Sequence, residues 1–208
     1  RSDLFPQQVQ ELIWLLTNTV PEDHPYHGLV LQPEIETRPE LWMLGSSDFG
    51  GALAAHVGIP FCYAQFINAQ HGDAVMQMYR DNFQPGYESA PRNAVAIFVV
   101  VAETEAEAED IAAAVDLRRL FMAYGQNLPV PTIAEAQSIQ YTERDRQIMA
   151  NERPRSIIGT PDQVAERMLA LREKFDTDEL IILTVAPSIK ARFRTAELLA
   201  QTFSLVSG

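Results

Sequence analysis

The chain has 208 residues, and its 28 acidic residues outnumber its 16 Lys and Arg, giving a formal net charge of −12. Such an acidic balance excludes a typical nucleic-acid-binding protein, which needs a basic face to neutralise phosphates. No stretch approaches ~18 uninterrupted apolar residues, so the sequence predicts no membrane span. Hydrophobic residues make up 47% of the chain, an ordinary globular composition, and we expect a single domain over residues 1–208.

The single cysteine and the first residue bear on the cellular setting. Cys62 can form no disulfide within the chain, and we expect it to be a small buried residue in a protein of the reducing cytoplasm. The chain starts with Arg1 and shows no signal-peptide pattern. It opens inside a predicted helix, so we expect it to be a piece of a longer protein.

Helices and strands alternate along the predicted fold. In chain order we expect a helix over 5–16, a strand over 41–44, a helix over 46–57, a strand over 59–64, a helix over 71–83, a strand over 94–102, a helix over 104–124, a helix opening at 160, a strand over 179–186 and a helix over 188–203. Alternation of this kind predicts an α/β fold with a parallel sheet. The strand over 94–102 is nearly continuous in Val, Ile and Phe, which is typical of a parallel strand buried on both faces.

Three further segments complete the prediction. Residues 21–39 form a long loop punctuated by proline, and residues 125–158 form a partly helical insertion before the last strand. Thr160 is the expected N-cap of the helix that follows, and Gln163 can complete its capping box. The four predicted strands cannot close a barrel, so they form either a small open sheet or half of an eight-stranded (β/α)8 TIM barrel.

The first candidate site follows the first predicted strand, because ligands of parallel α/β folds bind at the carboxyl ends of strands. Residues 45–51 read G-S-S-D-F-G-G. Gly45 permits a tight turn, Ser46 or Ser47 can cap the next helix, and unpaired N–H groups at the helix start can hold an anion. The motif is neither a P-loop nor G-x-G-x-x-G, and an ordinary capped turn explains the local pattern as well.

Two other strand ends carry residues of interest. After the second strand, Phe66 can wall a planar ligand, and Gln65 and Asn68 can bond to its polar edges. His71 in the same segment can act as a base, although an exposed histidine at a helix start is the simpler interpretation. The third end, residues 158–161, is either another anion site or a plain capped helix.

The sequence offers no catalytic nucleophile and no metal site. It contains no G-x-S-x-G, no H-E-x-x-H and no His, Asp and Glu cluster at metal-ligand spacing. An enzyme that relies on a bound organic cofactor needs few acidic or basic groups of its own. The absence of these motifs is therefore compatible with a cofactor-dependent enzyme.

At three segments the chain resembles the luciferase-like flavin-dependent monooxygenases, the family of bacterial luciferase, and most closely its single-subunit alkanal-monooxygenase-like branch. The resemblance rests on residues 39–47 (PELWMLGSS), 54–61 (AAHVGIPF) and 78–85 (MYRDNFQP), with G-T-P at 159–161 and Val164 matching the late helix start. Together these segments run through most of the chain, and their order and spacing are more specific than any one of them.

The resemblance implies a (β/α)8 barrel of which this chain is the second half, with strands five to eight. It implies reduced FMN, which a separate reductase can supply, and O2 as co-substrates, with a small organic molecule such as an aldehyde as the substrate. The flavin phosphate would lie at Gly45, Ser46 and Ser47, with Asp48 and Phe49 as further cofactor contacts. The family's catalytic histidine belongs to its first four strands, which are absent here, so no catalytic residue is assigned and we expect the chain alone to be inactive.

Two alternatives stay open at this point. The chain can be a non-catalytic flavin-binding or partner subunit, or it can belong to an oxidoreductase of the same fold that uses a deazaflavin. We expect pairing with the missing N-terminal half or a homo-oligomer, because a half barrel exposes two strand edges. No nucleic-acid or membrane partner is expected.

Overall fold

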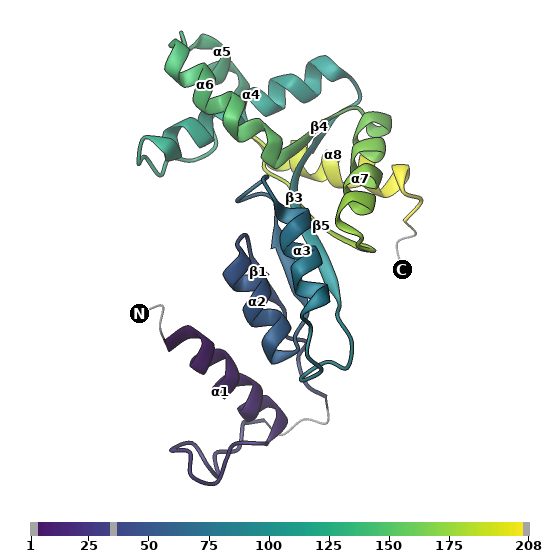
Figure 1. The fold of residues 1–208 in the computed structure, drawn as a ribbon. Helices are drawn as coiled ribbons and strands as arrows, with labels where there is room; N and C mark the ends of the chain where they lie inside the picture. Colours follow the sequence, from purple (N-terminus) through teal and green to yellow (C-terminus); the bar gives the residue numbers. More distant parts are fainter. Residues whose placement is uncertain (1–3, 34–36, 206–208) are drawn as a thin grey trace. The chain divides into compact units, whose positions relative to one another are not determined.

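A computed structural model describes residues 4–33 and 37–205. The chain forms two compact units, one of residues 1–62 and 74–93 and the other of residues 63–73 and 94–208. Figure 1 follows the chain from the N-terminal helix in purple to the C-terminal helix in yellow. The chain passes between the units three times, within strand β2, within helix α3 and at the start of strand β3 (Asn93–Val101), and each unit is described by itself.

The first unit contains helices and strands from the N-terminal part of the chain. Its elements are α1 (Phe5–Thr17), β1 (Met43–Gly45), α2 (Asp48–Val57), the start of β2 (Phe61–Ala64) and most of α3 (Gly72–Asp81). Helix α1 ends where Asn18 adopts the left-handed conformation, and α2 ends in the same way at Gly58. The ring of Phe61 packs against Tyr79 of α3 with centroids 5.5 Å apart, and both side chains are fully buried.

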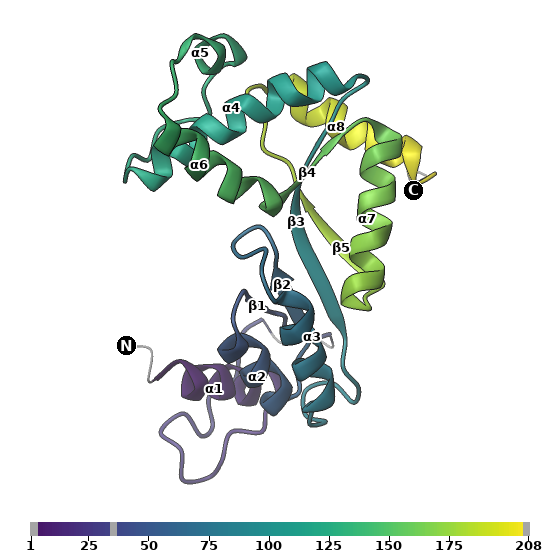
Figure 2. The same cartoon turned by 45° about the horizontal axis from the view of Figure 1, so that its top comes forward.

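The second unit is built on a parallel sheet. Its elements are β3 (Asn93–Val101), α4 (Glu105–Ala123), α5 (Ile133–Ser138), α6 (Glu143–Glu152), a 3-10 turn (Arg153–Arg155), β4 (Ser156–Gly159), α7 (Pro161–Phe175), β5 (Glu179–Leu183) and α8 (Ile189–Thr202). The second half of β3 pairs in parallel with β4, with Phe98 opposite Ser156, and its first half pairs in parallel with β5, with Ala94 opposite Glu179. Helices α5 and α6 both pack on α4 (Figures 1 and 2).

Strand β3 has apolar layers on both of its faces. One face packs with β4, α7 and α8 in a cluster of Ile97, Val99, Val101, Ile157, Val164, Met168, Leu198 and Leu199. The other face packs with α4 in a cluster of Val100, Ala102, Ala108, Ile111, Ala112, Val115 and Ile158. The predicted double burial of this strand is therefore confirmed.

The fold agrees with the predicted α/β class and parallel sheet. The helix starts follow their capping signals: Thr104 accepts a hydrogen bond from the Glu107 N–H at 3.2 Å, and the Gln163 side chain accepts from the Thr160 N–H at 3.0 Å. Within the predicted insertion over 125–158, the structure forms two helices and, at its end, strand β4, which the sequence analysis did not predict. Among the described residues, none of the helices is long and apolar enough to cross a membrane.

The hydroxyl group of Tyr79 links two loops of the first unit. It lies 3.0 Å from the carbonyl oxygens of both Ile59 and Arg92 and accepts a hydrogen bond from the Arg92 N–H at 3.3 Å. We predict that Tyr79→Phe lowers the free energy of unfolding by about 1–3 kcal/mol, because the backbone groups of Ile59 and Arg92 lose the hydroxyl that they bond to. Urea unfolding measures this. The control is Tyr87→Phe, which removes an exposed hydroxyl bonded to the Pro39 carbonyl and should cost at most ~0.5 kcal/mol. Equal losses for the two variants would contradict the prediction.

The same hydroxyl gives a pH-dependent contribution to stability. Burial raises the pKa of Tyr79 to about 12, whereas an unfolded tyrosine has a pKa of about 10. The stabilisation is therefore fully present below about pH 10 and is lost as the pH rises towards 12. We predict that the difference in unfolding free energy between the wild type and Tyr79→Phe shrinks across this window. Urea unfolding below and within it tests this, and a difference that stays constant would refute the assignment to Tyr79.

Candidate functional site

The turn between β1 and α2 carries the predicted cofactor-binding residues. Gly45 ends β1, and Ser47 is the N-cap of α2 with an extended backbone, φ −141° and ψ 162°. The Ser47 carbonyl accepts the first helical hydrogen bond, from the Gly51 N–H at 3.3 Å, while its hydroxyl makes no capping bond. Because the first N–H groups of a helix have no acceptor within the helix, those of α2 and the Ser47 hydroxyl are candidate donors to an anion.

Glycines allow the strand end and the helix start to lie close together in this turn. A Cβ atom added at Gly45 would lie 3.3 Å from the Phe61 ring and 3.5 Å from the Gly50 Cα. A Cβ atom at Gly51 would lie 3.0 Å from Val75 and 3.3 Å from Met78 of α3. Both positions are tightly packed, so a side chain at either glycine would require Phe61 or Val75 to move by a few tenths of an ångström.

The two other predicted cofactor residues lie in the first turn of α2 and face solvent. Phe49 is 56% exposed, which leaves its ring available to a ligand. Asp48 is exposed at the positive end of the helix, where a carboxylate stabilises the helix. The same carboxylate would repel a bound phosphate, so Asp48 is suited to supporting the helix rather than to holding an anion directly.

The residues of the second predicted segment, after β2, have different surroundings in the structure, and only some of them line a cavity. Phe66 packs edge-on against Phe98 of β3, with ring centroids 5.4 Å apart, and both line a cavity. Gln65 is buried, and its Oε1 has no hydrogen-bond partner among the described residues. Asn68 instead accepts a hydrogen bond from the Gln70 N–H within its own loop. His71 is exposed with φ 59°, as the simpler interpretation expected.

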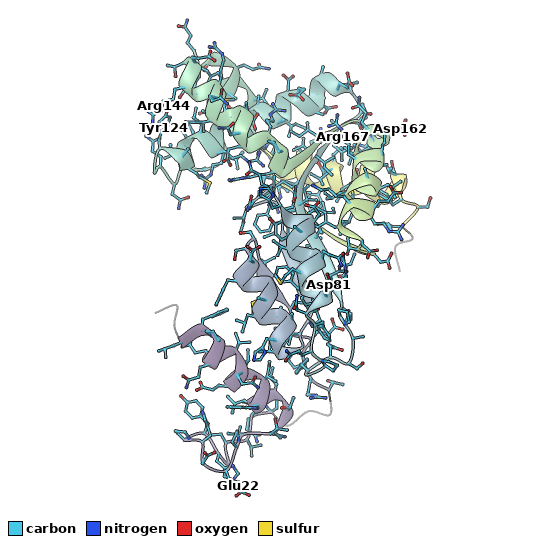
Figure 3. The ribbon with its side chains drawn as sticks, viewed as in Figure 1. Glu22, Asp81, Tyr124, Arg144, Asp162 and Arg167 are labelled. Carbon is cyan, nitrogen blue, oxygen red and sulfur yellow. The ribbon has the colours of Figure 1, made fainter. Side chains whose placement is uncertain are left out.

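The third predicted segment is occupied by side chains of the protein itself. The Gln163 side chain accepts from the Thr160 N–H and donates to Glu105 of α4, and a Cβ atom at Gly159 would meet its Oε1 at 2.6 Å. Arg167 of α7 donates to the Ile158 carbonyl at 2.8 Å; Figure 3 labels Arg167 and Asp162 on this helix. The Thr160 N–H is thus paired within the capping box, which fits the plain structural alternative.

A cavity of about 670 Å³ lies in the second unit. It is lined by Phe66, Ile67, Phe98, Val115, Arg118, Arg119, Met122, Ala123, Val130, Glu152, Arg155 and Val185. Most of these side chains are apolar. The lining comes from the segments after β2 and β5, from β3, from the second half of α4 and the loop after it, and from the end of α6 and the 3-10 turn. We call it the Phe98 cavity. Its size lies in the range of small-molecule sites in proteins.

Buried charges support one wall of the Phe98 cavity. Arg119 lies over the Phe98 ring at 5.2 Å and donates to the Ser156 hydroxyl at 2.5 Å. Asp116 accepts a hydrogen bond from Arg153 at 2.5 Å and lies 3.7 Å from Arg119. Burial raises the pKa of Asp116, and the two arginines oppose that rise. The cluster joins α4 to the 3-10 turn and to β4, which fixes the Arg119 side chain.

The arginines that line this cavity were not predicted from the sequence. Asp116, Arg118 and Arg119 interrupt an otherwise apolar stretch of the helix over 104–124, and that interruption was the available signal. Among the described residues no group of three or more His, Cys, Asp or Glu side chains could hold a metal ion. Cys62 is buried, as expected.

Parallel α/β folds with ligand-binding groups at the ends of their strands are typical of enzymes that act on small molecules. Within that class, the chain belongs to the luciferase-like monooxygenase family, whose model matches residues 9–178. The resemblance stated from the sequence is therefore confirmed at the level of the family.

The chain is also similar to individual proteins and solved structures. The uncharacterized protein YceB of Bacillus subtilis (strain 168) is 36% identical over 200 residues, which cover 96% of this chain and 60% of YceB. The crystal structure of apo-MsnO8 is 28% identical and superposes with a TM-score of 0.86 over 100% of this chain and 63% of MsnO8. Riboflavin lyase (RcaE), solved with modified FMN and riboflavin, shares the fold at 17% identity, a TM-score of 0.50, and 82% and 44% coverage. The chain thus spans about 60% of the length of YceB and MsnO8.

The buried cluster on α4 yields a stability prediction. We expect Asp116→Ala to lower the free energy of unfolding by about 3–5 kcal/mol, because the buried Arg119 guanidinium loses its acidic partner. Glu109→Ala is the matched control, because Glu109 is a more exposed partner of the same Arg153, at 2.9 Å, and should contribute at most ~1 kcal/mol. Urea unfolding of the two variants measures the difference. Similar, small losses in both would show that Asp116 does not hold this wall.

Proposed function

We propose that the chain is the second half of a (β/α)8 barrel in an FMN-dependent monooxygenase that oxidises a small organic substrate with O2. The family resemblance suggests an aldehyde as one such substrate. Bound reduced FMN would supply two electrons, so that one oxygen atom of O2 enters the substrate and the other leaves as water. We assign no catalytic residue in this chain, and we expect the chain alone not to turn over.

The half-barrel part of the proposal is supported by the coverage and by the edge of the sheet. The matched regions cover nearly all of this chain but 60–63% of YceB and MsnO8. In the second unit, β5 pairs with β3, and Ile181 of β5 is 42% exposed. On α8, Ile189 and Phe193 are 71% and 67% exposed. We propose that the missing N-terminal half, or a second copy of the chain, covers these apolar positions, since an open strand edge favours pairing.

The turn between β1 and α2 is the observation that carries the cofactor assignment. A flavin phosphate carries a charge of about −2 and needs several hydrogen-bond donors. Gly45, Ser46 and Ser47 form a turn closely packed by glycine, with a Ser47 hydroxyl that no capping bond uses. The exposed Phe49 ring lies one residue into the helix, where it can cover an adjoining part of the cofactor. These residues fit the phosphate end of FMN.

The proposal predicts a selective effect of Ser47→Ala on FMN binding. We expect the variant to bind FMN about tenfold more weakly, because a hydrogen bond to a charged group contributes about 1.5–3 kcal/mol. Riboflavin, which lacks the phosphate, should bind the variant and the wild type equally. Flavin fluorescence titration measures both affinities, and inorganic phosphate should compete with FMN alone.

The control for this experiment is Ser89→Ala, which removes an exposed hydroxyl from another loop of the same unit and should change neither affinity. Asp48→Asn provides a change in the opposite direction, since removing the carboxylate should tighten FMN binding relative to riboflavin. Failure of the wild-type protein to bind any flavin would overturn the function proposed here. Equal weakening of FMN and riboflavin by Ser47→Ala would overturn the phosphate site.

A further inference from the structure

The Phe98 cavity combines an apolar wall with an excess of positive charge. Its lining includes three arginines, Arg118, Arg119 and Arg155, against one acid, Glu152. This local excess stands out in a chain whose net charge is −12. The acid is already neutralised, because Arg155 donates to the Glu152 carboxylate at 2.5 Å.

Arg118 differs from the other two arginines in its partners. Arg119 is held by Asp116 and Ser156, and Arg155 by Glu152. Arg118 donates from Nη2 to the Asn127 side chain at 2.8 Å, while its Nη1 is buried with no hydrogen-bond partner. Among the residues that the structure describes, no carboxylate lies within ion-pair distance of Arg118. A buried guanidinium N–H without an acceptor is costly, and an anion entering the cavity would satisfy it.

We propose that the Phe98 cavity binds the organic substrate and that this substrate is an amphipathic anion, with a carboxylate or sulfonate paired to Arg118. Its apolar body would pack on Phe66, Phe98 and Met122. The assignment as substrate rests on the function proposed above, which it narrows to molecules that carry an acid group. The planar guanidinium can bind both oxygens of such a group. A neutral substrate of the same shape would leave Arg118 unpartnered, so the cavity discriminates against it.

Two naphthalene probes that differ by one sulfonate test this cavity. 1-Anilinonaphthalene-8-sulfonate carries the anion, and N-phenyl-1-naphthylamine has the same aromatic frame without it. We expect Arg118→Met to weaken binding of the sulfonate by about tenfold and to leave binding of the neutral probe unchanged. Fluorescence titration of each probe, on protein whose circular dichroism matches the wild type, gives both affinities.

Three further variants make the experiment specific. Arg192→Met removes an exposed arginine of α8 in the same unit and should change neither affinity. Ala123→Phe narrows the cavity from the exposed end of α4 and should weaken both probes, which locates them there. Arg118→Lys keeps the charge and should fall between the wild type and Arg118→Met, which keeps the test valid if the latter fails to fold.

The outcomes separate this inference from the proposed function. Unchanged sulfonate binding in Arg118→Met, or equal weakening of both probes, overturns the anion site even if FMN binds. Selective loss of the sulfonate supports the site. If the same wild-type protein then binds no flavin, the anion site stands while its assignment to a monooxygenase substrate is overturned.

Discussion

Strand β3 is the constraint on which the second unit depends. It is buried on both faces, and it forms parallel ladders with β4 and with β5. Parallel neighbours cannot be joined by a tight turn, so the chain must cross over by a helix each time it returns to the sheet. The helices from α4 to α6 precede β4, and α7 precedes β5. These crossovers bring together, around Phe98, side chains that lie far apart in the sequence.

The buried charges of α4 follow from the same arrangement. Residues of α4 that face β3 and β4 are mostly Ala, Ile and Val, and they form a dry layer. Asp116 and Arg119 fall on the buried side of the helix, where neither would be stable without a partner. Arg153, in the turn that leads into β4, supplies one partner, and Ser156 at the start of β4 supplies another. The ionic cluster therefore connects α4 to the start of β4.

Most elements were predictable because their signals are local. The apolar run over 94–102 and the capping residues Thr104 and Thr160 each mark an element without reference to the rest of the chain. Strand β4 was not predictable in this way, because its four residues follow a proline and two arginines and become a strand only by pairing with β3. Whether such a short segment forms a β-strand is decided by the strands beside it.

The residues of the candidate sites likewise differ in whether a local sequence signal marks them. The Gly45–Ser47 turn and the wall residue Phe66 were found because a strand end followed by glycine or an aromatic residue is visible in the sequence. Arg119 was not found, since its role comes from contact with Phe98 and Ser156, which are about 20 and 37 positions away in the chain. Arg118 was not found either, since its place in the cavity lining depends on the fold. A charge within an apolar helix indicates burial, but its partner is known only from the fold.

The two anion sites proposed for this acidic chain would have to attract their ligands at short range. With a net charge of −12, the chain repels anions at long range, but solution ions screen that repulsion beyond about 8 Å at physiological salt. Discrimination then depends on donors that contact the ligand directly. The proposed site at Ser47 would use backbone N–H groups at the start of α2. The proposed site in the Phe98 cavity would use a guanidinium in apolar surroundings, where a single ion pair is stronger than in water. Direct contacts of both kinds can bind an anion although the net charge of the chain is negative.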